Sequence, residues 1–333
     1  MRTLPPIFVA CALWVGAGFS PVARAGEPFL IQNDHPIGRL YGLPAGDDLA
    51  GVGATGFQAR AAFDVANNSC ESVRGGDELV FDGETWVARF AARQGWRNGW
   101  RLALLVPLVS HQGGDTDDFI ENYHDALGLP DGNRKTRPAG RLEYRCAHVG
   151  RPGFDLEDSA TGLGDVRISL GAPLWRNAAT TRALDAVAGA ELPTGDPDRL
   201  LGSGSWDFSF GLAAADAATL ASWNLELHGE VGVLALTDGE VLEDFQEPFA
   251  GYGTVSVGWR LARWLVPRLQ LDAHSPFFAD TGWAALDDWG VALASGATVR
   301  LPGKFDLDVA VAEDVVVNTA PDVVFHVGLK RSL

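Results

Sequence analysis

A connection between two predicted strands carries the side chains best suited to chemistry. Its first part groups acidic residues and histidines: His111, Asp115, Asp117, Asp118, Glu121, His124 and Asp125. Carboxylates in such a cluster could bind a divalent cation, because oxygen ligands suit calcium. His–Asp and Asp–Asp pairs could instead form an acid/base set. The third interpretation, a solvated acidic loop, is the one we favour.

We therefore predict no catalytic residue, no enzyme activity and no resident cofactor. Calcium is the one cofactor that the sequence leaves open, with Asp115, Asp117 and Asp118 as the weak metal candidates. A calcium titration of the purified protein that gives neither heat nor a thermal shift would exclude calcium binding.

Two cysteines, Cys70 and Cys146, remain once the predicted targeting segment is set aside. An even pair in an exported chain most simply forms one disulfide. Both fall in long connections between predicted strands, which would bring them to one rim if those connections leave the same side. Two separate thiols are the alternative.

Residues 1–25 resemble a secretory signal peptide. Arg2 supplies a positive end, residues 7–19 form an apolar run, and Ala23, Arg24 and Ala25 give a small–x–small cleavage pattern. No run of about eighteen uncharged apolar residues follows, so we expect no spanning helix in the mature chain. An exported chain of this kind is periplasmic, extracellular or an outer-membrane barrel. Residues 26–53 lack sustained alternation and are predicted to form an irregular lead or plug segment.

From residue 54 to 333, apolar residues alternate with polar or small ones in segments of roughly ten residues, as in a membrane-spanning barrel wall. Successive side chains on a strand point to opposite faces, so each segment has one apolar and one polar row. The predicted strands are 55–65, 85–93, 100–109, 165–174, 182–192, 205–214, 222–236, 251–261, 265–274, 288–301, 304–313 and 321–331. We predict an all-β fold: a closed antiparallel transmembrane β-barrel of about twelve strands with meander topology. A soluble exported β-sandwich is the alternative.

Short and long connections alternate along the chain, which predicts tight turns at one rim and long loops at the other. The longest connection, residues 110–164, is the predicted long extracellular loop. Tryptophans fall at both ends of the strands, as in the aromatic belts at membrane interfaces. Trp96, Trp100, Trp175, Trp223, Trp259 and Trp264 lie at short turns, and Trp86, Trp206, Trp283 and Trp289 lie near long loops.

The polar rows carry charges of both signs, which can pair across a lumen. A charge facing lipid would instead cost about 2–4 kcal/mol near the midplane. The predicted lumen charge network is Arg60, Arg89, Arg101, Arg167, Glu191, Asp207, Glu226, Glu230, Arg260, Arg268, Asp272, His274, Asp306 and Asp308. Because a barrel of about twelve strands is narrow, we expect a filled or partly blocked interior.

The formal charge of −17 excludes a nucleic-acid partner, because phosphate binding needs a basic face. The expected partners are outer-membrane lipid and the barrel assembly machinery. We predict a passive conduit or binding barrel for a small solute. A non-conducting structural or surface-interaction barrel is the alternative, and a rim-site hydrolase is a more remote one.

Three stretches, residues 123–134, 82–84 and 42–44, are distinctive, and together they resemble DUF3187, a family of domains of unknown function among Gram-negative outer-membrane β-barrels. Residues 162–167, 191–196 and 201–207 resemble a broader pattern of transporter-like barrels. The loop residues that carry the resemblance are His124, Asp125, Gly128, Pro130, Asp131 and Arg134. The resemblance implies an outer-membrane barrel with no assigned activity and carries over no catalytic residue. Leu333 departs from the Phe or Trp with which such barrels usually end.

Overall fold

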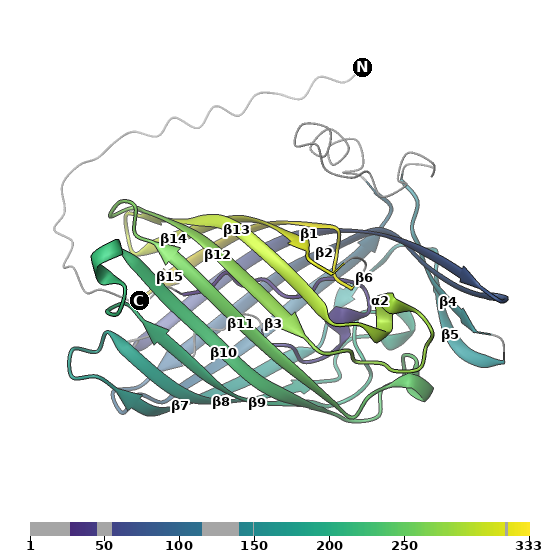
Figure 1. Ribbon diagram of the computed structural model, residues 1–333, viewed down its shortest axis with the longest axis horizontal. Coiled ribbons are helices and arrows are strands. Elements are labelled where there is room, and N and C mark those ends of the chain that lie inside the picture. Colours follow the sequence, from purple (N-terminus) through teal and green to yellow (C-terminus); the bar gives the residue numbers. More distant parts are fainter. Residues whose placement is uncertain (1–26, 45–54, 115–139, 149, 317–318) are drawn as a thin grey trace, which may run out of the picture.

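A closed barrel of antiparallel strands forms the body of the computed structural model (Figure 1), which describes residues 27–44, 55–114, 140–148, 150–316 and 319–333. The wall strands, in chain order, are β1 (Gly56–Arg74), β2 (Asp77–Gly95), β3 (Arg101–Gln112), β7 (Val166–Arg176), β8 (Arg182–Leu192), β9 (Asp207–Asp216), β10 (Leu225–Leu236), β11 (Phe249–Trp259), β12 (Leu265–His274), β13 (Gly290–Leu301), β14 (Phe305–Asp314) and β15 (Val323–Ser332). Each pairs with the next, and β15 pairs with β1 from Gln58↔Ser332 to Asn67↔Val323. The predicted twelve-strand meander barrel is confirmed.

The strands have their apolar row outside and their polar or small row inside. On β3, Leu102, Leu104 and Leu108 are 42–45% exposed, whereas Arg101 is 2% and Leu105 3% exposed. A soluble sandwich would show the reverse, since its apolar rows would meet in the core. The exposed apolar band runs around the wall strands, and a patch of that extent marks a surface that contacts something other than water.

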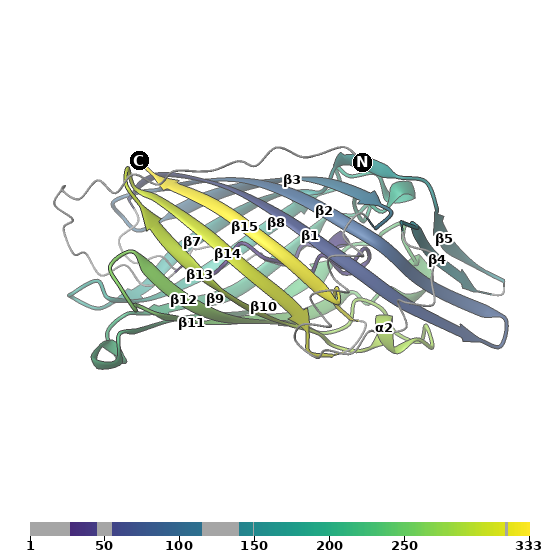
Figure 2. The ribbon, with the colours of Figure 1, turned by 90° about the horizontal axis from the view of Figure 1, so that it is seen from above.

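Three further strands lie within the connection between β3 and β7: β4 (Glu143–His148), β5 (Arg151–Leu156) and β6 (Ala160–Leu163). β4 pairs with β2, and β5 pairs with β4. The long β1–β2 hairpin therefore continues past the barrel as a four-stranded sheet (Figure 2). The sequence pattern predicts a connection for this part of the hairpin. It is strand because each of its residues has a partner on a neighbouring strand, which local patterning does not reveal.

The remaining elements are short and lie in connections. They are the 3₁₀ turns η1 (Gly38–Leu40), η3 (Pro197–Arg199), η4 (Ala221–Trp223) and η5 (Glu243–Phe245), and the single helical turn α2 (Ala284–Asp287). Among the described residues, no helix is long and apolar enough to cross a membrane.

The two rims differ as the alternation of connections predicted. The short-turn rim, which carries the β2–β3, β7–β8, β9–β10, β11–β12 and β13–β14 turns, also holds the C-terminus (Figure 1). The protruding hairpin and the longer connections lie at the opposite end, the long-loop rim. Trp283 departs from the predicted belt: it is 3% exposed and packs among the long loops. Its ring lies 4.2 Å from that of His148, so it faces protein.

The structure contradicts the predicted disulfide. Cys70 on β1 lies opposite Phe81 on β2, whereas Cys146 on β4 lies opposite Leu79 on the other side of β2. Two strand spacings separate the cysteines by about 9.5 Å before any offset along the strands. A disulfide needs Cα atoms within roughly 7 Å. Both side chains are buried and no bond joins them.

Candidate functional site

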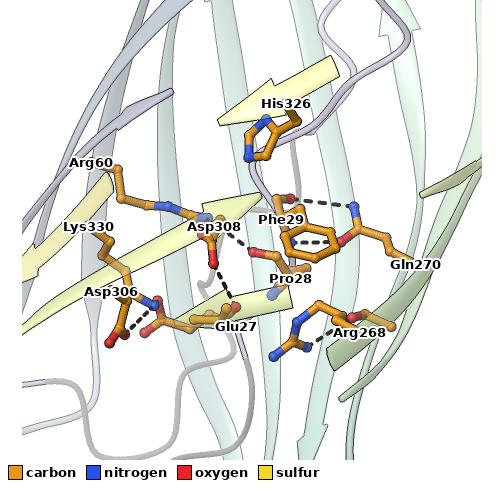
Figure 3. Close-up of polar contacts among 12 residues, drawn as sticks. Glu27, Pro28, Phe29, Arg60, Arg268, Gln270, Asp306, Asp308, His326 and Lys330 are labelled. Atoms are coloured by element: carbon orange, nitrogen blue, oxygen red, sulfur yellow. Dashed lines mark hydrogen bonds and ion pairs between the residues drawn. The ribbon is translucent and has the colours of Figure 1, made fainter. Parts of the chain in front are cut away.

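The lumen contains residues 27–44, here called the lumen segment, which run through the barrel as an irregular chain (Figures 1 and 2). The segment enters near the short-turn rim, where Glu27 forms ion pairs with Lys330 and, at 3.6 Å, with Arg93. Figure 3 shows its next contacts: the carbonyl oxygen of Pro28 accepts from Arg60 at 3.1 Å, and the N–H of Phe29 donates to Gln270 Oε1 at 2.8 Å.

Arg89 on β2 joins the middle of the segment to the wall. Its guanidinium donates to the carboxylates of Asp34 and Asp64 and, at 3.1 Å, to Gln32 Oε1. His326 Nδ1 lies 2.6 Å from the other oxygen of Asp64. Arg89 and both carboxylates are almost fully buried. A cation shared by two buried carboxylates is costly to remove, because each is then left without its counter-charge.

The part of the segment near the long-loop rim turns at η1 and contacts the wall again. Arg39 donates to the carbonyl oxygens of Leu200 and Leu201 at 3.1 and 3.3 Å, and Gly42 N donates to Asp207 Oδ2 at 3.1 Å. Asn33 Nδ2 bonds the carbonyl oxygen of Thr319. These bonds go mostly to backbone or neutral groups, for which water can substitute.

The long-loop rim is closed by an apolar cluster that the lumen segment helps to build, here called the mouth cluster. The segment contributes Ile37, Leu40, Tyr41 and Leu43. The protruding sheet, the loops and the wall strands β10 and β11 contribute Cys70, Leu79, Phe81, Leu142, Tyr144, Cys146, Leu156, Ala160, Leu200, Leu234, Leu236, Val241, Leu242, Phe245, Ala250, Tyr252, Phe277, Phe278, Trp283 and Leu286. The Tyr41 ring lies 4.8 Å from that of Phe277. Burial of apolar surface therefore holds the segment at this end, at about 1.5–3 kcal/mol per fully buried large side chain.

His35 lies beside this cluster with its ring 4.3 Å from that of Phe81, in an edge-on arrangement. Burial, together with the neighbouring His274, lowers the pKa of His35 to about 3. The imidazole is therefore neutral at physiological pH while the segment is in place.

Other predicted lumen residues pair within the wall. Arg101 pairs with Asp185, Arg167 with Glu191 at 2.9 Å, Arg268 with Glu226 at 2.9 Å, Arg60 with Asp308 at 3.5 Å, and Asp306 with Lys330 at 3.2 Å. Glu230 accepts from Tyr252, Asp272 accepts from Thr254 and Gln270, and His274 contacts Asn33. Arg260 lies just past β11 at the short-turn rim, where its N–H donates to Asn224 O.

Of the acidic-loop candidates, His111 lies in the described part of the chain. His111 lies at the end of β3, buried between Thr85 Oγ1 and the carbonyl oxygen of Leu200, each 3.0 Å away. Asp115, Asp117, Asp118 and the family-like loop residues His124, Asp125, Gly128, Pro130, Asp131 and Arg134 lie outside the described residues. Within the described part of the chain, no group of three or more His, Cys, Asp or Glu residues is arranged to hold a metal ion.

The alternation in the sequence predicts the wall charges but not their partners on the lumen segment, above all Asp34 and Gly42. Gly42 packs tightly, because a Cβ built on it would lie 3.2 Å from Asp207 Cβ and 3.3 Å from Glu191 Cβ. A branched side chain at this position cannot fit without moving the segment or the wall.

We expect Gly42→Val to loosen the outer part of the lumen segment, since overpacking of this kind costs about 1–3 kcal/mol. Limited proteolysis of the folded protein measures the effect as faster cleavage within residues 27–44. Gly42→Ala adds only the Cβ and should be cleaved more slowly than the valine variant. Equal cleavage of wild type and Gly42→Val would contradict the tight fit.

The sequence profile described as "Protein of unknown function (DUF3187)" matches residues 5–332. The chain belongs to this family. The match confirms the resemblance inferred from the loop and strand-end motifs. No curated protein matches this DUF3187 chain significantly.

Solved structures similar to this DUF3187 protein are outer-membrane barrels. The crystal structure of the COG4313 outer-membrane channel from Pseudomonas putida F1 matches 89% of this chain and 98% of its own, with TM-score 0.56 and 12% identity. The NanC porin matches 83% of this chain and all of its own, with TM-score 0.48 and 8% identity. At such identities the first match supports the fold, and the second adds no argument.

Proposed function

We propose that this DUF3187 protein is a barrel of the Gram-negative outer membrane that serves as a passive conduit for a small solute, held closed by the lumen segment. The exposed apolar wall and the similarity to an outer-membrane channel fold support the location. The conduit rests on one observation: a separate stretch of chain, residues 27–44, occupies the lumen and contacts the wall mainly through side-chain hydrogen bonds, ion pairs and the mouth cluster. Planar-bilayer recordings of the full chain and of a chain lacking these residues test it.

One observation favours the alternative of a non-conducting surface-interaction barrel. The four-stranded sheet of β1, β2, β4 and β5 extends well past the barrel and could present a docking surface (Figure 2). This alternative expects no current even after the lumen segment is deleted, so the same recordings separate the two.

Placing an arginine on the outer wall tests the membrane location. Leu104 is 43% exposed on β3. If it faces lipid near the midplane, Leu104→Arg lowers the free energy of unfolding in lipid vesicles by about 2–4 kcal/mol. A substitution at an ordinary water-exposed site changes the free energy of unfolding by no more than about 0.5 kcal/mol. Denaturant titration measures this, with Leu104→Phe as the apolar control. A loss below about 0.5 kcal/mol for the arginine variant would place Leu104 in water.

Acidification is expected to favour release of the lumen segment. The pKa of His35 is about 3 when buried and near its ordinary value of about 6.5 when released. The released state therefore binds more protons between these values, and the contribution of His35 to closure is complete above about pH 6.5 and shrinks as the pH falls. This one group shifts the equilibrium by up to about tenfold per pH unit.

Conductance recorded between pH 7.5 and 5 measures this shift. The His35→Phe variant keeps an aromatic ring against Phe81 and removes the titrating group, so it should lose that part of the pH dependence. An identical pH profile for both proteins would show that His35 does not contribute.

A further inference from the structure

A pocket lies between the lumen segment and the wall, on the side of β11, β12 and β13. It encloses about 440 Å³, including the part open to solvent. Ile31, Leu43 and Pro44 of the lumen segment line one side, and inward side chains of the three strands, including Tyr252 and Ala292, line the other. The lining is mostly apolar, with a small number of polar side chains, as in sites that bind small organic molecules.

Asp272 is the charged residue in this lining. Its Oδ1 accepts from Thr254 Oγ1 at 2.6 Å and its Oδ2 from Gln270 Nε2 at 2.9 Å, and both donors are neutral. The nearby His274 is also neutral: Nε2 must accept from the amide nitrogen of Asn33, and Nδ1 must donate to the carbonyl oxygen of Ser275. The pocket therefore holds a negative charge that its own hydrogen bonds do not neutralise.

This situation differs from that of four other carboxylates on the inner wall. Asp64, Asp185, Glu226 and Asp308 each face an arginine. No ion pair between described residues includes Asp272.

We propose that this pocket binds a small organic ammonium ion, with the amine on Asp272 and the apolar body against Leu43 and Pro44. The Tyr252 ring adds a face that attracts cations. A bare metal ion fits less well, because calcium needs six to eight oxygen ligands and the lining offers one carboxylate among mostly apolar groups. The inference rests on the proposed function and deepens it, since it names the chemical class of solute that would enter the lumen.

Calorimetry on the purified full chain in detergent tests the site, with benzylammonium and benzyl alcohol as probes and empty micelles as the blank. The probes are similar in size and differ in charge. We expect benzylammonium to bind at least about tenfold more tightly, since bonds between charged partners are the stronger kind. In Asp272→Asn the two affinities should become equal.

Asp308→Asn is the matched control. Asp308 also accepts from a threonine at 2.6 Å, Thr298, but it lies outside the pocket lining and faces Arg60. This variant removes the same formal charge and should leave benzylammonium binding unchanged. If Asp272→Asn does not fold, Ala292→Lys takes its place: Ala292 lies opposite Asp272 on β13, so a lysine there supplies the missing cation. Benzylammonium should then lose its preference while the carboxylate remains.

Equal affinities for the two probes in the wild type would overturn the inference, and so would an unchanged preference in Asp272→Asn or Ala292→Lys. The result is separate from the conduit proposal, because no membrane or current is involved. Ammonium binding without conductance would keep the site and reject the conduit. Conductance without an ammonium preference would keep the conduit and reject the site.

Discussion

Deletion of residues 27–44 is expected to turn a closed barrel into one that carries current in a planar bilayer. The deletion removes the occupant of the lumen and the four side chains that the segment adds to the mouth cluster. The wall keeps its own pairs: Arg89 retains Asp64, and Arg268 retains Glu226. We therefore expect the barrel to persist around a water-filled lumen, with sustained open events where the full chain shows brief events or none.

A matched variant tests whether any chain in the lumen blocks current or whether the specific contacts of residues 27–44 are needed. Replacing residues 27–44 with glycine and serine at the same length leaves a tether of equal reach and removes the anchors at Asp34 and Tyr41. If those contacts close the lumen, this variant should also conduct. Compact gel migration of unboiled sample confirms that each variant is folded. A folded deletion variant without current would reject the conduit and favour the non-conducting barrel.

The substitution Arg89→Met is expected to give the largest loss of stability, about 3–5 kcal/mol. Arg89 is 1% exposed and lies between the carboxylates of Asp34 and Asp64, which its removal would leave buried side by side. Methionine fills much of the same volume, so the loss of stability comes from the missing charge more than from a cavity. Denaturant unfolding in lipid vesicles measures it.

Arg182→Met is the control for this loss. Arg182 pairs with Asp216 at 3.2 Å, but the side chains are 42% and 26% exposed, so the pair is worth at most about 1 kcal/mol. The triple variant Arg89→Met, Asp34→Asn, Asp64→Asn should recover part of the loss, because no uncompensated charge remains buried. Equal effects of Arg89→Met and Arg182→Met would show that the buried network does not stabilise the barrel.

Alternation along each wall strand was sufficient to predict the barrel. The observed bounds of β8 and β12 coincide with the predicted ranges 182–192 and 265–274. β1 and β2 run past theirs, because their outer halves pair with each other and with β4. Residues 77–84 lack a simple alternation of burial: Leu79, Val80 and Phe81 are buried in succession, since both faces of the sheet are covered there.

The sequence by itself determined the closed antiparallel barrel, the side of each strand that faces the lumen, and the difference between its rims. These follow from a period of two and from connection lengths, which are local properties of the chain. Only the tertiary structure decided what the inward charges bond, that Arg89 is shared between the wall and the lumen segment, that β2 separates the cysteines, and that Asp272 lines a pocket. Each of these depends on contacts between residues far apart in the chain, and no local pattern encodes which distant side chain lies opposite another.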